Sequence, residues 1–224
     1  MKKVAVNVIT EQNLLEVHND VINFLFSDRE TYEQELANNN IQIDYFICHP
    51  NVTEGFYGTA FENSTIISSR LVNEERMFNN VHNGYNEETL IKLKPLFTRM
   101  YRSYINSLQL HKHTTKNFYD MVIGYDNCLK DFRIHPKQNF TIENDFLYTH
   151  IIEPRWLKIN YDIFICSPST FLKMVNVWHF FKIISDQTFK IWDFLQTAEN
   201  PDRFVLPMFT NMQTIKIRDI RNDL

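Results

Sequence analysis

The sequence predicts an α/β protein with a largely parallel sheet flanked by helices. Short apolar runs typical of strands alternate along the chain with longer segments whose apolar residues recur at helical spacing. The run from Tyr119 to Ile123 is apolar enough to indicate a strand that is covered on both faces of a sheet. No internal repeat and no linker divides the 224 residues. We therefore expect a single domain over residues 1–224 with one substantial core.

The expected elements follow one another in a regular order. Residues 4–9 alternate toward a first strand, and a helical pattern then opens at Thr10 and Glu11 and continues to Leu25. The segment 27–40 is polar and charged and ends in a turn signal. Further strands are expected at 43–48, 66–72, 119–123, 146–152, 163–166 and 214–217, and further helices at 87–113, 171–184 and 187–197. In the helix at 87–113, an apolar side is expected to run from Leu90 to Leu108, with a kink or a first turn at Pro95.

Composition and charge limit the classes of function. The formal net charge of −4 provides no broad positive field for phosphate backbones, so we expect no nucleic-acid partner. No stretch approaches the roughly 20 apolar residues that span a bilayer, and the N-terminal segment has the pattern of a strand and not of a signal peptide. Cys48, Cys128 and Cys166 are odd in number and widely spaced. This spacing favours buried thiols in a reducing compartment, and a cytoplasmic location is expected.

The best-defined catalytic motifs are missing. The sequence contains no GxGxxG after the first strand, no GxxxxGK[ST], no GxSxG and no HExxH. In an α/β protein with a parallel sheet, ligands bind beyond the carboxyl ends of the strands. Asp126 follows the strand 119–123 within the acidic turn Tyr125-Asp126-Asn127, so it is expected at that edge, either as a ligand-binding residue or as an aspartate that closes a turn.

From about Asp44 onward, the order of features resembles a group of GT-A glycosyltransferases found in bacterial surface-polysaccharide clusters and in large DNA viruses. In that group a long helix leads to a strand of the form YDxVIxxxD, matched here by residues 119–123 and Asp126. The segment from Asn160-Tyr161-Asp162 through Phe171 resembles a later element, in which Asn-Asp precedes an apolar strand and a Ser-capped helix. Two closing motifs resemble residues 199–202 and 215–217. The chain departs from the group at Gly124, where an arginine is usual, and at Tyr161, which is an insertion.

The resemblance implies a mixed, mostly parallel GT-A sheet and a transferase that uses a nucleotide-sugar donor and a glycan or glycoprotein acceptor. It also implies a divalent cation, Mn or Mg, that neutralises the diphosphate leaving group. An aspartate at a strand end suits such a hard cation, and Asp126 is the expected metal ligand. The donor is expected near Thr10, Glu11 and Asn13, with Arg70 placed to meet a phosphate. Glu11 could instead favour a helix N-terminus, and Arg70 could be an ordinary surface cation.

An inverting transferase also needs a carboxylate that deprotonates the acceptor hydroxyl. Asp162 is the leading candidate for this base, followed by Asp145 and Glu153, although Asp162 could be a boundary residue bonded to backbone. A retaining enzyme would need no such base. The main alternative function is a non-catalytic α/β interaction module of a viral or phage protein, favoured by Gly124 and by the lack of a DxD triplet. A methyltransferase-like enzyme is disfavoured because no glycine-rich turn follows Ile9.

Overall fold

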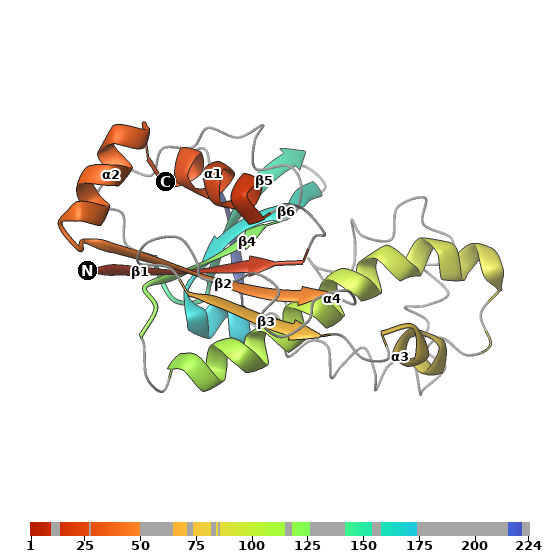
Figure 1. Ribbon diagram of the computed structural model, residues 1–224. Helices are drawn as coiled ribbons and strands as arrows, with labels where there is room; N and C mark the ends of the chain where they lie inside the picture. Colours follow the sequence, from red (N-terminus) through yellow and green to blue (C-terminus); the bar gives the residue numbers. More distant parts are fainter. Residues whose placement is uncertain are drawn as a thin grey trace.

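The protein forms one seven-stranded mixed sheet with helices on both faces (Figure 1). The structure, a computed structural model, describes residues 1–9, 14–26, 28–49, 65–70, 74–81, 84, 86–114, 118–125, 142–153, 158–173 and 215–220. The prediction of an α/β protein with a mixed and mostly parallel sheet flanked by helices is confirmed.

A single reversed strand interrupts the parallel sheet. The strands are β1 (Lys2–Val8), β2 (Ile41–His49), β3 (Ile66–Arg70), β4 (Met121–Tyr125), β5 (Phe146–Glu153), β6 (Lys158–Cys166) and β7 (Lys216–Asp219). Their order across the sheet is β3-β2-β1-β4-β6-β5-β7. Strand β6 is antiparallel to β4 and β5, whereas the other described neighbours pair in parallel.

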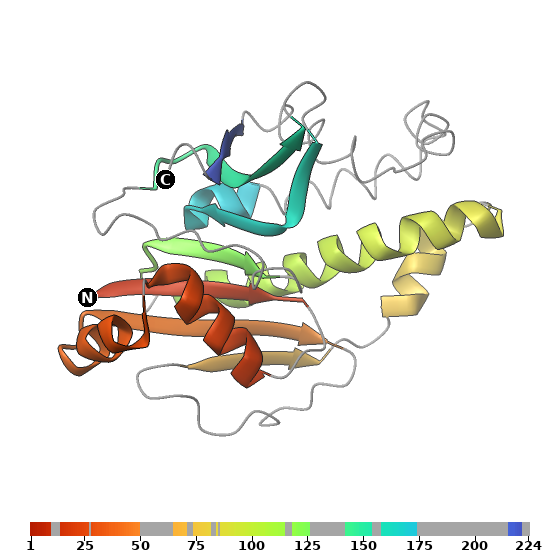
Figure 2. The ribbon, with the colours of Figure 1, turned by 90° about the horizontal axis from the view of Figure 1, so that it is seen from above.

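Four labelled helices accompany the sheet: α1 (Leu14–Leu25), α2 (Arg29–Ala37), α3 (Glu74–Val81) and α4 (Glu87–Thr114). Figure 2 shows α1 on one side of the parallel strands and α4 on the other. In both ribbon views, α3 and the first half of α4 project beyond the arrowheads of β1, β2 and β3. Within the described part of the chain, no helix has both the length and the apolar character needed to cross a membrane.

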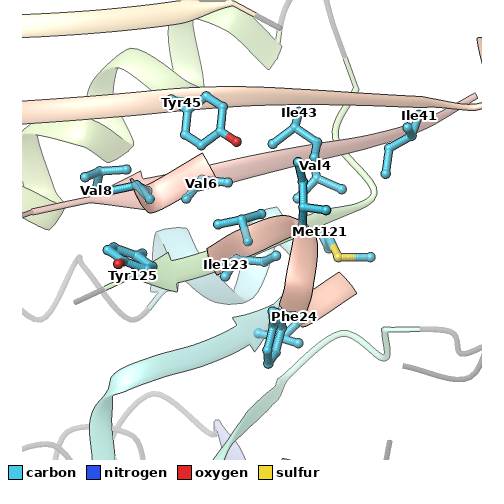
Figure 3. Close-up of a cluster of buried hydrophobic side chains, with 14 of the residues drawn as sticks. Val4, Val6, Val8, Phe24, Ile41, Ile43, Tyr45, Met121, Ile123 and Tyr125 are labelled. Atoms are coloured by element: carbon cyan, nitrogen blue, oxygen red, sulfur yellow. The ribbon is translucent and has the colours of Figure 1, made fainter. Parts of the chain in front are cut away.

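The α1 face of the sheet holds an apolar core. Alternate residues of β1, which are Val4, Val6 and Val8, point to this face because side chains alternate along a strand. Figure 3 shows them packed with residues from β2, β4 and α1. The additional labelled residues are Phe24, Ile41, Ile43, Tyr45, Met121, Ile123 and Tyr125. Burial of these large side chains holds α1 against this face of β1 and β2.

The α4 face is more polar than the sequence predicted. The long helix predicted at 87–113 is confirmed, and it continues through Pro95 without interruption. Leu108, however, which we placed on its apolar side, is 42% exposed. The buried positions in this part of α4 include Ser103, Asn106 and Ser107 together with Leu110. The helix therefore packs on the sheet partly through small and polar side chains.

Two helices were not predicted. The polar segment 27–40 contains α2, whose N-cap is Asp28, with its Oδ1 accepting a hydrogen bond of 2.6 Å from the Thr31 backbone N–H. Tyr32 is the only buried residue of α2, so the segment carries almost no apolar periodicity. Helix α3 is short and opens with Glu74 and Glu75.

Candidate functional site at the carboxyl edge of the sheet

The ends of four parallel strands and the beginning of β6 lie at one edge of the sheet. Strands β1, β2, β3 and β4 end there at Val8, His49, Arg70 and Tyr125. Because β6 runs in the opposite direction, its first residues lie at this same edge beside the end of β4, and the last pair between the two strands joins Tyr125 to Ile163. In open α/β sheets this is the edge at which ligands bind.

Two of the predicted site residues lie in described strands at this edge. Arg70 is the last residue of β3 and pairs with His49. Asp162 lies in β6, next to Ile163. The positions of Thr10, Glu11, Asn13 and Asp126 fall outside the described residues. Two strands separate β3 from β4, so these two strands lie about 14 Å apart at the usual spacing of strands.

The backbone of β6 is irregular around Asp162. On the β5 side, Phe164 pairs with Thr149, and the next pair joins Asn160 to His150. Thr149 and His150 are adjacent, whereas three residues of β6, 161–163, lie between their partners and form a bulge. Such bulges change the direction of the strand and of its side chains. Asp162 is the central residue of this bulge. Glu153, the last residue of β5, also belongs to this edge.

Two other acidic residues, one of them the candidate base Asp145, lie at the opposite edge. Asp120 precedes β4, and its Oδ2 accepts a hydrogen bond of 2.7 Å from the Lys3 backbone N–H. Asp145 precedes β5 and forms an ion pair with Lys173. Its backbone N–H also donates to Thr170 Oγ1 at 2.9 Å. Asp145 therefore belongs to the packing of the helical turn after β6, and the structure removes it from the candidates for the base.

Gly124 leaves room for an aromatic ring. A Cβ atom at this position would lie far inside van der Waals contact with the ring of Phe164, its partner on β6. The Phe164 ring stacks in turn on Phe171, with centroids 6.0 Å apart. The space in which the resembling family carries an arginine is therefore occupied here by the Phe164 side chain.

A cluster of polar groups joins the end of β1 to α4, and we call it the β1–α4 polar cluster: Asn7, the carbonyls of Val8 and Ile9, Ser103, Asn106 and Arg102. Asn7 Nδ2 donates to Ser103 Oγ at 3.0 Å, and Asn106 Nδ2 donates to Asn7 Oδ1 at 2.7 Å. The Asn106 amide also donates to the Val8 carbonyl at 3.1 Å. Asn7 and Asn106 are almost fully buried, so their side-chain amides cannot form hydrogen bonds with solvent. The bonds within the cluster take the place of those lost hydrogen bonds to water.

Arg102 is the charged member of this cluster. Its guanidinium forms a two-point contact with Glu74, with Nε–Oε1 at 3.0 Å and Nη2–Oε2 at 3.1 Å. Its Nη1 donates to the Ile9 carbonyl at 2.8 Å. The Arg102 and Glu74 side chains are only 10% and 14% exposed. A charge this far from water requires a partner, and Glu74 supplies it.

Cys48 lies near this ion pair. Burial raises the pKa of the Cys48 thiol to about 12, with the positive charge of Arg102 opposing the shift and Glu74 reinforcing it. Burial also raises the pKa of Cys166. Both thiols are free and buried, as predicted, and both stay protonated at neutral pH. Neither has the properties of a nucleophile.

The last residue of β4, Tyr125, is hydrogen-bonded to helix α1. The Tyr125 hydroxyl donates to Asp20 Oδ2 of α1 at 2.8 Å, and the Tyr125 side chain is buried. The residue that precedes Asp126 in the chain is therefore fixed by both its strand pairing and this hydrogen bond.

Sequence reasoning missed the β1–α4 polar cluster. The interruption of an apolar strand by Asn7 is visible in the sequence, and Ser103, Asn106 and Ser107 recur at helical spacing. No sequence pattern, however, connects residues that are about a hundred positions apart. Within the described ranges, no group of three or more His, Cys, Asp or Glu side chains is arranged to hold a metal ion.

No protein-family model, curated protein or solved structure matches this chain. The functional interpretation therefore depends on the residues and their geometry.

Proposed function

We propose that this protein is a metal-dependent glycosyltransferase of GT-A architecture that transfers a sugar from a nucleotide-sugar donor to a glycan or glycoprotein acceptor. The observation that carries the proposal is the antiparallel register between β4 and β6. The pairs run from Val122 with Cys166 to Tyr125 with Ile163. Continued by one residue, this register would bring Asp126 opposite Asp162 at the ligand-binding edge.

The order of the strands supports the same proposal. The described strands form a mixed, mostly parallel sheet of order β3-β2-β1-β4-β6-β5-β7 in which β6 alone is reversed. A mixed, mostly parallel sheet is what the sequence resemblance implies, so the observed sheet supports the proposal.

A divalent cation fits the residues that this proposal brings together. Carboxylate oxygens from two neighbouring strands suit Mg or Mn, and such ions commonly use one or two carboxylates together with phosphate oxygens of the substrate. Asp126 is the proposed ligand. When bound, the cation would neutralise the charge that develops on the departing nucleoside diphosphate.

For the acceptor, we assign Asp162 the role of general base in an inverting transfer. Its carboxylate would take the proton of an acceptor hydroxyl while that oxygen forms a bond to the anomeric carbon. The bond from this carbon to the diphosphate oxygen breaks, and the electron pair leaves with the nucleoside diphosphate. Glu153 is the alternative base because β5 ends at the same edge. Thr10, Glu11, Asn13 and Arg70 remain the proposed contacts to the donor.

The proposal is tested first by ligand binding. Thermal unfolding is measured with and without Mn²⁺ against a panel of nucleoside diphosphates and nucleotide sugars. A ligand that binds only the folded state at a hundredfold excess over Kd stabilises it by about 2.7 kcal/mol. We expect a shift with one class of nucleotide that requires Mn²⁺. The absence of any shift in a folded sample would favour the non-catalytic interaction module.

Three variants then assign the roles of the aspartates. Asp126→Asn should abolish Mn²⁺-dependent nucleotide binding, and Asp162→Asn should retain this binding and lose transfer. Asp120→Asn is the matched control, because Asp120 lies at the opposite end of β4 and contacts backbone. It should keep both properties even if its stability falls. Unchanged nucleotide affinity in Asp126→Asn would disprove the metal-ligand role.

A further inference from the structure

We infer that Arg102 is a positioning residue for the donor-binding segment that follows β1, and that its ion pair with Glu74 holds it in place. This inference rests on the proposed function, since it concerns how the same edge of the sheet is prepared for a nucleotide. Neither Arg102 nor Glu74 was among the residues that the sequence indicated.

Three consecutive residues at the end of β1 are bonded to one helix. The Asn7 side chain contacts Ser103 and Asn106, and the Asn106 amide also reaches the carbonyl of Val8. Arg102 donates a hydrogen bond to the carbonyl of Ile9, which is the first residue after the strand. The direction in which the chain leaves β1 is therefore set by α4 and not by sheet pairing alone.

The bond from Arg102 to Ile9 is geometrically restrained. A guanidinium presents its donors in a rigid plane, so two of its nitrogens on the Glu74 carboxylate fix the direction of the third. Glu74 is the first residue of α3, which follows β3 in the chain. Arg102 thus connects the ends of β1 and β3, where we place the donor contacts Thr10, Glu11, Asn13 and Arg70.

The cluster also holds a buried oxygen without a hydrogen-bond partner among the described residues. This atom is Asn106 Oδ1, whose amide nitrogen is engaged by Asn7 and Val8. An unpaired buried oxygen is costly and is retained in few places of a folded protein. Because the amide of Asn106 is bonded to Asn7 and Val8 at the end of β1, this unpaired oxygen favours a functional constraint on the cluster over simple packing.

The informative variant removes the positioning bond without leaving a buried charge. Arg102→Met combined with Glu74→Gln deletes both charges, keeps similar volumes and removes the donor to the Ile9 carbonyl. The matched control is Arg29→Met with Glu33→Gln on α2, an exposed Arg–Glu pair of the same 3.0 Å length. Arg102→Lys keeps the positive charge but lacks the guanidinium plane, and it serves as the conservative variant.

Two measurements are made on each variant. Amide hydrogen exchange of the peptide that contains residues 7–13 reports on the segment without any nucleotide. The Kd of the nucleoside diphosphate that binds best in the presence of Mn²⁺ reports on donor binding. For the Arg102→Met/Glu74→Gln pair we expect faster exchange in this peptide and a Kd raised about tenfold, the loss of one hydrogen bond from a charged donor. Arg102→Lys should show a smaller rise, and the α2 control should show neither change.

The outcomes separate the two proposals. Faster exchange with an unchanged Kd, or no change in either measurement, would overturn the positioning role and leave the transferase proposal in place. A rise in Kd also in the α2 control would mean a general loss of stability and would likewise overturn it. If the unmodified protein binds no nucleoside diphosphate, the proposed function fails and the positioning role fails with it.

Discussion

The ring of Phe164 lies where a side chain at position 124 would begin. Gly124 is in the middle of the α4 face, paired with Asn7 on one side and with Phe164 on the other. A glycine inside a buried strand weakens the strand unless another group uses the free space. Here the stacked rings of Phe164 and Phe171 occupy it. The departure from the resembling family at this position therefore has a packing explanation.

Gly124→Ala should destabilise the protein by roughly 2–3 kcal/mol, because the new methyl group must displace a ring that is itself packed against Phe171. Equilibrium urea unfolding measures the loss. Phe164→Ala in the same background tests the cause. Once the ring is removed, the added methyl group should cost little, so the double variant should lose less than the sum of the two single variants. Strict additivity would show that the ring is not the obstacle.

At the residue scale, the sequence identified positions but not partners. Asp126 was chosen because it follows an apolar strand, and Asp162 because of the family resemblance. Their strands β4 and β6 are neighbours, with Tyr125 opposite Ile163. Arg102 was not identified. A helical arginine is normally a surface residue, and only the fold shows that this one is buried against Glu74.

At the scale of elements, prediction succeeded where burial was strong. Each of the seven strands overlaps a strand expected from the sequence, and the clearest apolar runs are those of β1, β2, β4 and the second half of β6. The first residues of β6, from Lys158 to Asp162, are more polar and were not predicted as strand. Helix α2 was missed for the same reason, since Tyr32 alone is buried. An element that buries little leaves little apolar pattern in its sequence.

Helix α2 depends strongly on its N-cap because it buries so little surface. Asp28→Ala removes the acceptor for the Thr31 N–H and should cost about 1 kcal/mol. Asp28→Asn preserves a capping oxygen and should be nearly neutral, which makes it the control. Urea unfolding of both variants, followed by circular dichroism, measures the difference. Equal losses in the two variants would mean that charge and not capping is responsible.

At the scale of the whole molecule, the direction of β6 determines the candidate site. Sequence patterns predicted a strand at 163–166, which are the last residues of β6. They carry no information on whether this strand runs parallel or antiparallel to β4. Direction depends on how the connecting segments cross the sheet, which is a property of the complete fold. The pairing of the two aspartate-bearing strands could therefore not be predicted, although each strand could.

His18 joins three parts of the molecule. It lies in α1, its Nδ1 shares a hydrogen bond of 2.5 Å with the Tyr45 hydroxyl of β2, and its ring makes an edge contact with Tyr32 of α2. Burial lowers the pKa of His18 from 6.5 to about 4, and the positive charge of Arg29 adds to this effect. The folded protein therefore holds His18 in its neutral form at neutral pH.

This shift predicts how global stability depends on pH. Below about pH 6.5 the unfolded chain binds a proton at His18 that the folded chain does not accept until about pH 4. The stabilisation by neutral His18 is thus complete above pH 6.5 and is lost as the pH falls toward 4, by on the order of 3 kcal/mol in total. Urea unfolding between pH 7.5 and 5 should show His18→Gln losing less stability on acidification than the unmodified protein. Parallel pH profiles for the unmodified protein and His18→Gln would mean that the proton uptake on unfolding occurs elsewhere.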